Sequence, residues 1–220
     1  MLKFAIRLSL LAFRQSRRSI SGDDRIAKSG KRVAMQAIFE QFKSRAEAVS
    51  AEVHRFPDKS SALEFILKYL ESAGVADAPE SYAVWADCPF LLGINRKDIA
   101  ECIPGLSFEV TRERAADAKV GISQLDWAMA STGSLIQDAA PVERRLASTL
   151  PSIHIAIVET KRLLPDMPAV FRKIRPDQTN YISFITGPSR TADIERVLTI
   201  GVHGPEKLVV VFVDEMTGVN

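Results

Sequence analysis

Two runs of consecutive apolar residues constrain this chain more than any other feature. His154 to Glu159 reads HIAIVE and Leu208 to Asp214 reads LVVVFVD, so neither run alternates between apolar and polar residues. Strands of this kind are buried on both faces, as in parallel sheets that helices cover. Other β-type runs alternate with helical stretches along the chain, which is typical of the same class. The sequence therefore predicts an α/β fold, a three-layer sandwich with a mostly parallel sheet.

The remaining elements follow from periodicity. Strands are expected over residues 53–56, 82–86, 106–110, 119–123, 154–159, 181–186 and 208–214, and residues 125–131 are ambiguous. Helices are expected over residues 33–49, 60–74, 96–103 and 167–174. Ser60 or Ser61 is expected to cap the second of these helices, and Gly74 to end it. A further helix is expected after Thr191, because apolar residues repeat there at helical spacing up to Gly201: Ala192, Ile194, Val197 and Leu198.

The charge is distributed unevenly along the 220 residues. Residues 1–45 contain eleven Lys or Arg and three acids, whereas the rest of the chain is mildly acidic and the net charge is only +2. An acidic body argues against a broad nucleic-acid surface, so no nucleic-acid partner is expected. Residues 1–31 are predicted to be a basic N-terminal arm and linker, and residues 32–220 the α/β domain.

The basic arm has several interpretations. Residues 1–22 hold five basic residues and no acid, and on a helix Lys3, Arg7, Arg14 and Arg18 form one stripe. The arm could be a mitochondrial transit peptide, a helix in weak contact with a membrane surface through residues 1–20, or an ordinary packed or frayed helix. Arg7 interrupts the apolar stretch that a signal peptide needs. The polar segment from Ser21 to Lys31 is expected to be a linker.

Metal and cofactor signals are weak in this sequence. Cys88 and Cys102 are the only cysteines, which excludes a disulfide scaffold and a self-contained iron–sulfur cluster, since such a cluster needs about four thiolates. The three histidines show no metal-ligand spacing, and no phosphate-binding glycine motif is present. We therefore expect no metal and no cofactor on this chain.

Three loops carry the residues best suited to binding a small anion. In parallel sheets ligands bind at the carboxyl ends of strands, where these loops are expected. A helix N-terminus after Gly187 would combine backbone N–H groups with an Arg fork, and a glycine turn could offer its own N–H groups. The candidate ligand-binding residues are Thr132, Gly133, Ser134, Gly187, Ser189, Arg190, Thr191 and His203.

His203, which lies between Gly201 and Gly204 and before Pro205, is also the candidate acid or base for catalysis. Each of these patterns also has a purely structural interpretation. A Ser or Thr that caps a helix, an ordinary turn, a surface ion pair of Arg190 and a hydrogen-bonded loop histidine would give the same sequence.

Two motifs resemble those of a known family. The run FITGPSRTADIE at residues 184–195, followed by GVHGP at 201–205, is similar to the signature of the lactate-utilisation protein C family (LutC/YkgG, the LUD domain). VGIS at 120–123, ASTGSL at 130–135 and LPSIHIAIVE at 150–159 fit the same pattern, so the resemblance covers about residues 50–214.

The resemblance implies a fold like that of NagB/RpiA/CoA-transferase-like proteins. It also implies a cytoplasmic role in bacterial L-lactate oxidation to pyruvate, as the cluster-free component beside iron–sulfur partner proteins. The family pattern has an acidic residue before the TG pair, where this chain has Ser131. That departure favours a binding or assembly role.

Two other functions are compatible with the residues. The chain could be a free-standing enzyme that acts on a phosphorylated or CoA-linked small molecule, with Arg190 and His203 at its active site. It could also be an interaction module that docks through the basic arm.

Overall fold

The computed structural model describes residues 22–174, 177, 179, 181–192, 198–200 and 203–216. The chain divides into two units, Met1–Gln36 and Ala37–Asn220. Of the basic arm expected over residues 1–22, residues 1–21 lie outside the described residues. Residues 22–31, expected to be a linker, are instead helical, since helix α2 begins at Gly22. Among the described helices, none combines the length and the apolar character needed to cross a membrane.

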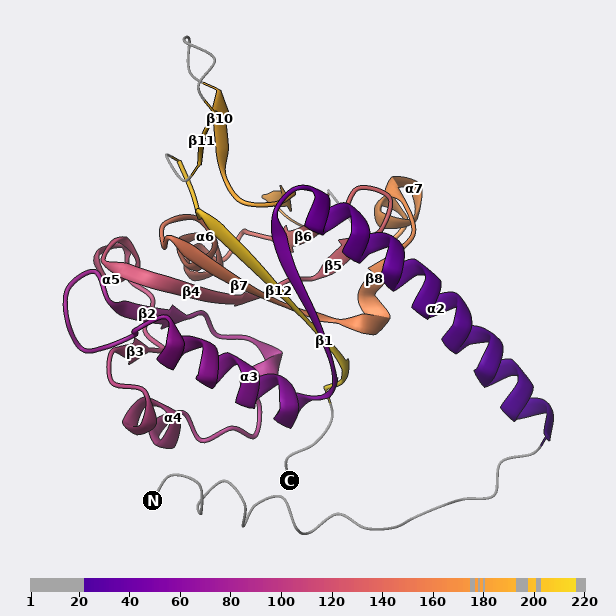
Figure 1. Ribbon diagram of the computed structural model, residues 1–220, viewed down its shortest axis with the longest axis horizontal. Helices are drawn as coiled ribbons and strands as arrows, with labels where there is room; N and C mark the ends of the chain where they lie inside the picture. The colour runs from indigo at the N-terminus through magenta and orange to yellow at the C-terminus, as the bar shows by residue number, and fades with distance from the viewer. Residues whose placement is uncertain are drawn as a thin grey trace. The chain divides into compact units, whose positions relative to one another are not determined.

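The second unit is built on a sheet of six parallel strands (Figure 1). Their order is β1-β12-β7-β4-β2-β3. The bounds are β1 Ala51–Asp58, β2 Tyr82–Trp85, β3 Leu106–Ser107, β4 Ala118–Gln124, β7 Ile153–Glu159 and β12 Lys207–Glu215. The two runs without alternation, β7 and β12, are adjacent in the middle of the sheet, with β1 and β4 on either side.

Helices cover both faces of this main sheet, which confirms the predicted three-layer α/β class (Figure 1). Apolar residues of α3 pack with Val209, Val211 and Val213 of β12 on one face. On the other face Phe42 of α2 meets Phe212 edge-on, with ring centroids 5.0 Å apart. The helices are α2 Gly22–Ala48, α3 Lys59–Ser72, α4 Arg96–Cys102, α5 Arg112–Ala116, α6 Val142–Thr149 and α7 Met167–Phe171, with short 3-10 turns at Pro89–Leu91 and Thr160–Arg162.

A second, four-stranded sheet was not expected from the sequence. Its order is β8-β5-β6-β9, with bounds β5 Trp127–Met129, β6 Ser134–Asp138, β8 Leu163–Leu164 and β9 Ile182–Ile185. The ambiguous stretch 125–131 contains β5, and the expected strand at 181–186 is β9. β6 pairs antiparallel with both β5 and β9.

The prediction of a helix after Thr191 is wrong. Arg190–Ala192 and Leu198–Ile200 are strands β10 and β11, which pair antiparallel with Arg190 opposite Ile200. Gly201, expected to end that helix, lies outside the described residues. Helix α3 confirms the expected helix at 60–74, but its cap is Asp58, whose side chain accepts a hydrogen bond from the Ser61 backbone N–H at 2.8 Å.

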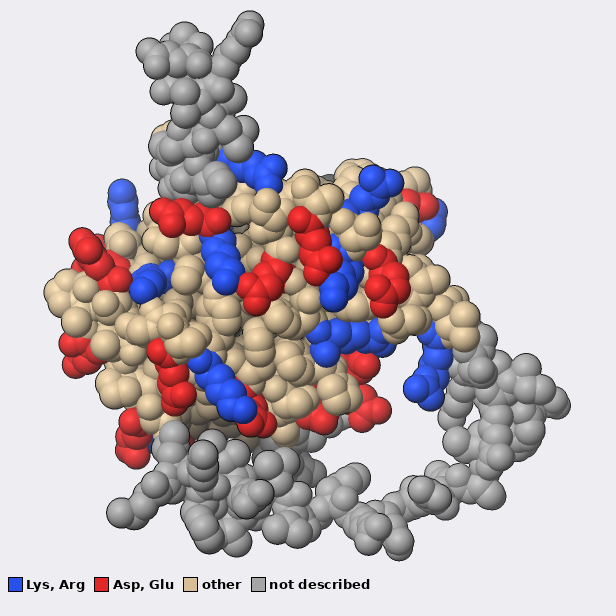
Figure 2. Space-filling model, in the orientation of Figure 1, with Lys and Arg blue, Asp and Glu red and all other residues tan. Residues whose placement is uncertain are grey.

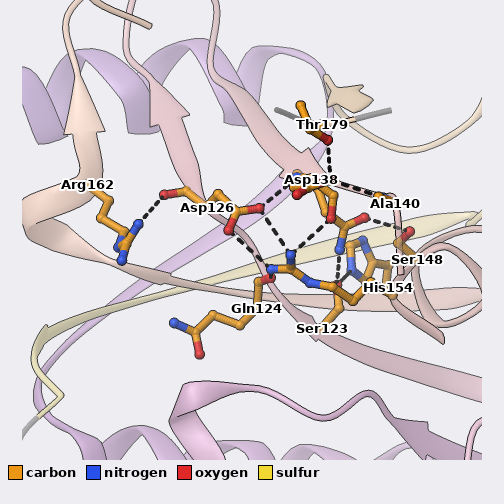
Figure 3. Close-up of polar contacts among 11 residues, drawn as sticks. Ser123, Gln124, Asp126, Asp138, Ala140, Ser148, His154, Arg162 and Thr179 are labelled. Atoms are coloured by element: carbon orange, nitrogen blue, oxygen red, sulfur yellow. Dashed lines mark hydrogen bonds and ion pairs between the residues drawn. The ribbon is translucent and has the colours of Figure 1, made fainter. Parts of the chain in front are cut away.

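Buried polar side chains join the two sheets to α6 (Figure 3). The Ser148 hydroxyl donates to the amide oxygen of Gln137, and the Gln137 amide nitrogen donates to the Ser123 hydroxyl. The donor–acceptor distance is 3.1 Å in each bond. That hydroxyl lies 2.9 Å from Nε2 of His154. The four residues come from α6, β6, β4 and β7, so one chain of polar contacts links a helix to both sheets. Burial lowers the pKa of His154 to about 3.

Nearer the surface, an arginine of α6 also bonds to β4 and β6. Arg144 of α6 donates to the carbonyl oxygens of Gln124 and Asp138, at 2.5 and 2.9 Å, and pairs with the Asp126 carboxylate at 3.3 Å. Asp126 in turn accepts from the Asp138 backbone N–H at 2.6 Å (Figure 3). The Thr179 hydroxyl donates to the Asp138 side chain at 2.6 Å and lowers the pKa of that carboxyl group. These bonds hold the end of β4 and the turn after it, at Asp126, against the end of β6.

Gly121 of β4 provides a test of how closely α6 packs on the sheet. A Cβ atom at this position would lie 1.9 Å from the Ala147 carbonyl oxygen, which is backbone and cannot rotate away. We expect Gly121→Ala to lower the free energy of unfolding by about 1–3 kcal/mol or more, because α6 must move. Urea unfolding measures the change. Gly204→Ala is the control, because its nearest neighbour is the Ser189 side chain at 3.2 Å; equal losses in both variants would contradict this account.

The buried histidine predicts a dependence of stability on pH. The unfolded chain takes up a proton at His154 below its ordinary pKa of 6.5, whereas the folded chain does so only near 3. The folded pKa is lowered, so acid favours the unfolded state and stability falls as the pH drops from about 6.5 towards 3.

We expect His154→Gln to flatten the slope of unfolding free energy against pH by about 1.4 kcal/mol per pH unit, measured by urea unfolding between about pH 5.5 and 4.5. His203→Gln is the control, because His203 is exposed. An unchanged slope in His154→Gln would show that His154 titrates in the folded protein as it does in water.

Candidate functional site

The structure brings the three loops singled out by sequence together. We call Thr132–Ser134, Thr186–Arg190 and His203–Pro205 the three-loop cluster. The Ser134 hydroxyl lies 2.6 Å from the Thr132 hydroxyl and 2.7 Å from the Thr186 hydroxyl, which links the first two loops. The backbone N–H of Ser189 donates to the Pro205 carbonyl oxygen at 2.8 Å, which links the second loop to the third.

The strands that carry these loops explain the contact. Ser134 begins β6 and Thr186 follows β9, and the two strands pair antiparallel with Leu135 opposite Ile185. The start of one strand therefore lies beside the end of the other. The third loop leads directly into β12 of the main sheet, and the Glu206 backbone N–H, just before β12, donates to Ser152 ahead of β7 at 2.8 Å.

The cluster lies at the edge of the main sheet opposite to the expected one. Gly133 packs on Ala46, at the end of α2, and Gly187 packs on Val49, just ahead of β1. Because β1, β7 and β12 are parallel and start at this edge, the cluster is at their amino ends. The expectation of carboxyl ends is wrong because β6 and β9 belong to the second sheet, and their ends do not follow the direction of the main sheet.

The two glycines have a structural reason to be glycines. Gly133 and Gly187 have φ angles of +68° and +70°, in the left-handed region. A Cβ on Gly133 would lie 2.4 Å from the Ala46 nitrogen, and one on Gly187 would lie 2.6 Å from the Val49 oxygen. Close packing against the α2–β1 connection therefore requires both residues. Their role in binding a ligand stays a prediction.

Arg190 is positioned by a residue that sequence analysis did not single out. Its Nη2 donates to the hydroxyl of Ser50 at 2.8 Å, and the side chain is exposed. Ser50 joins α2 to β1 and has a φ angle of +69°. This bond uses one of the five guanidinium N–H donors. Arg190 begins β10 rather than a helix, so the helix N-terminus expected beside it is absent from this described stretch.

The other candidate residues differ in surroundings. Thr132 is exposed and Ser134 is buried. Ser189 is half-buried and packs on Gly204, where an added Cβ atom would lie 3.2 Å from the Ser189 Cβ. His203 is exposed in the turn before Gly204. The side chain of Thr191 lies outside the part of the chain whose side chains are described. Sequence analysis missed Ser50 and the hydroxyl contribution of Thr186, since both contacts join residues far apart in the chain.

The arrangement offers hydroxyl groups and a guanidinium on one rim. Thr132, Thr186 and Arg190 are exposed, and the buried Ser134 hydroxyl lies between the two threonines. Hydroxyl and guanidinium N–H groups are the donors that carboxylates and phosphates accept from in proteins. On the face drawn in Figure 2, basic and acidic side chains are interspersed among the described residues. Lys207 and Glu52 form an ion pair at 2.8 Å between the neighbouring strands β12 and β1.

A solved structure shares the fold. The crystal structure of a DUF162 family protein from Deinococcus radiodurans superposes with a TM-score of 0.53 and 19% sequence identity. The superposition covers 81% of this chain and 98% of that one. At this identity the likeness supports the α/β architecture alone.

Curated relatives are similar over part of their length. Lactate utilization protein C from Exiguobacterium sp. (strain ATCC BAA-1283 / AT1b) is 37% identical over 114 residues, which are 49% of this chain and 50% of that protein. Lactate utilization protein C from Bacillus subtilis (strain 168) is 35% identical over 109 residues, 47% of this chain and 45% of that protein. The chain thus spans about half the length of the curated relatives it matches.

The family itself is identified over a longer stretch. A family model described as the LUD domain matches residues 39–213, which include the main sheet from β1 almost to the end of β12 and all three loops of the cluster. This confirms the resemblance inferred from the GPSRTADIE and GVHGP motifs. Because the match covers well over half of its length, the chain belongs to the LUD domain family.

Proposed function

We propose that this chain is the cluster-free component of a bacterial system that oxidises L-lactate to pyruvate. In this proposal it binds the iron–sulfur proteins of that system and a small anionic ligand. The observation that carries the proposal is the LUD domain match over residues 39–213, together with relatives named Lactate utilization protein C. The cytoplasm is the compartment we propose for it.

The cysteine content supports a role without a cluster. The 220 residues contain two cysteines, whereas an iron–sulfur cluster needs about four thiolate ligands. Cys88 is buried, and burial raises the pKa of its thiol, which disfavours the thiolate that ligates iron. Electrons removed from lactate would therefore pass through clusters on partner proteins.

The three-loop cluster is the site that we propose for the anionic ligand. Arg190 can grip a carboxylate or phosphate with two parallel N–H groups, and its bond to Ser50 leaves that geometry open. The linked hydroxyl groups of Thr132, Ser134 and Thr186 use two of their three protons in bonds to one another, so one hydroxyl proton is left as a further donor. Ser131, in place of an acid before the TG pair, supports binding rather than catalysis.

Growth on L-lactate tests the proposed role. We expect a strain that lacks the gene to grow normally on glucose and to grow poorly or not at all on L-lactate, because the oxidation system is incomplete. Growth curves measure this, and the full chain supplied in trans is the control. Affinity purification of the tagged chain from cells grown on L-lactate should recover iron–sulfur proteins. Normal growth of the deletion strain on L-lactate, with no such protein recovered, would refute the proposal.

Arg190→Ala tests the ligand site. Loss of a charge-assisted hydrogen bond should weaken binding of inorganic phosphate by about 1.5–3 kcal/mol, or roughly 10- to 150-fold. Isothermal titration measures the affinity. The free energy of unfolding should change by less than about 1 kcal/mol, because the residue is exposed.

Arg112→Ala is the matched control, because it removes an exposed arginine of α5. Equal phosphate affinity in Arg190→Ala and Arg112→Ala would exclude Arg190 from the ligand site.

A further inference from the structure

One edge of the second sheet is an uncharged strand with an open side. β9 is the last strand of that sheet, and within the described part of the chain β6 is its only paired neighbour. Phe184 is 43% exposed, and the other residues of β9 are half-buried. The run from Tyr181 to Thr186 reads YISFIT, with no charge, glycine or proline. Its aromatic and β-branched residues favour an extended backbone.

The other described strands at sheet edges are poorly suited to pairing with another chain. β3 and β8 have two residues each, and β10 and β11 have three. β1 is longer, but it contains Pro57 and three charged residues, Glu52, Arg55 and Asp58. Short strands, charges and proline are the means by which natural sheets keep an edge from pairing. β9 has four residues and neither a charge nor a proline.

The ladder with β6 directs the backbone of two β9 residues to the open side. The Ala139 backbone N–H donates to the Tyr181 carbonyl oxygen at 2.9 Å, so these opposite residues are a hydrogen-bonded pair. Along antiparallel strands such pairs alternate with pairs that exchange no bond. Counted from Tyr181, Ile182 and Phe184 belong to the second kind and direct their N–H and carbonyl groups away from β6. An added strand can bond to both residues.

The same two residues extend an apolar face of the second sheet. Phe184 lies opposite Ile136, which forms a buried cluster with Met129 and with Val170 of α7. Ile182 packs against this cluster and shares the face of Phe184, because side chains two positions apart in a strand point the same way. An added strand would therefore continue an apolar face that now ends at an exposed phenylalanine.

Three cations near the start of β9 have no acidic partner. The Arg145 guanidinium lies 5.3 Å from the centre of the Tyr181 ring. Arg172 and Lys173 are exposed, and the residue that follows them packs on the same apolar cluster as β9. Among the residues that the structure describes, no carboxylate forms an ion pair with any of the three cations. Asp177 is the one acid between Lys173 and β9 in the sequence, so a positive excess remains.

We propose that the open edge of β9 binds an extended segment of a partner protein by strand addition. The segment would carry apolar residues at alternate positions and acidic residues at the end that meets Arg145. Backbone bonds to Ile182 and Phe184 would supply affinity, and the apolar face and the cations would select the side chains.

A second copy of this chain is a poorer occupant. In antiparallel self-pairing the end of one β9 would meet the start of the other, and residues 185–190 contain no acid to face Arg145. The proposal rests on β9 and its surroundings, and neither the role in lactate oxidation nor the anionic ligand of the three-loop cluster enters it.

A synthetic peptide and the full chain test the proposal. The probe is a fluorescein-labelled peptide of alternating valine and threonine with two glutamates at each end, and fluorescence anisotropy measures its binding. We expect saturable binding, weaker by about tenfold or more when lysine replaces each glutamate, because like charges then meet. In NMR hydrogen exchange the Ile182 and Phe184 amides should become protected only when the peptide is bound, whereas the Ser183 amide should be protected in both states.

Phe184→Pro removes an outward N–H without breaking a bond to β6, so it should abolish peptide binding and keep the fold. Phe184→Val is the matched control, because it keeps the N–H in a strand-forming residue and should retain saturable binding. Circular dichroism checks that each variant folds. If Phe184→Pro does not fold, Ile182→Pro replaces it, since the Ile182 N–H also points away from β6.

Three results would overturn the proposal. The first is the absence of saturable binding of the glutamate peptide to the parent chain. The second is equal peptide binding by Phe184→Pro and Phe184→Val. The third is a dimer of the parent chain in analytical ultracentrifugation that Phe184→Pro converts to a monomer, because β9 would then pair with a second copy.

Discussion

Burial of β12 on both faces is the constraint on which the rest of this structure depends. Its odd-numbered valines pack on α3, and Phe212 meets Phe39 and Phe42 of α2 on the opposite face. A strand in this position must be flanked by strands on both edges, and β1 and β7 take those places in parallel. Once the three strands share a direction, the turn from α2 into β1 and the loop into β12 must lie at one edge. That edge holds the three-loop cluster.

Local sequence patterns predicted the elements that are buried in a regular way against the main sheet. Continuous apolar runs predicted β7 and β12, and helical spacing predicted α3. The hairpin of β10 and β11 was missed, although Thr191, Thr199 and Ile200 are β-branched and favour strands. The residues 22–31 were predicted to be a linker because of their glycines, yet Asp23 and Asp24 lie at the start of α2, where acidic side chains favour a helix. In both places the sequence carries two opposed local signals, and the structure follows the β-branched residues in one and the acidic helix start in the other.

The contact among the three loops could be anticipated from the sequence, but its place in the fold could not. The motifs around Gly133, Arg190 and Gly204 pointed to three loops, and the structure brings them together. Their edge of the main sheet depends on which sheet β6 and β9 join, and a short strand does not specify its partner. The bond from Arg190 to Ser50 joins residues 140 positions apart, so no local pattern reports it. Lys59, the first residue of α3, is only 3% exposed for a reason that local patterns do not report either, because the segment at Pro89–Leu92 covers it.

The two cations differ in how much hydration they lose on folding. An exposed arginine such as Arg190 loses little solvation, so a bond to a hydroxyl is enough to account for its place. A buried ammonium loses most of its hydration, and a carbonyl oxygen with an aromatic ring replaces only part of it. Folding alone would favour methionine or leucine at position 59, since an apolar side chain fills the same space without that loss. Lysine at position 59 therefore costs folding free energy that the Leu92 carbonyl and the Phe90 ring offset only in part.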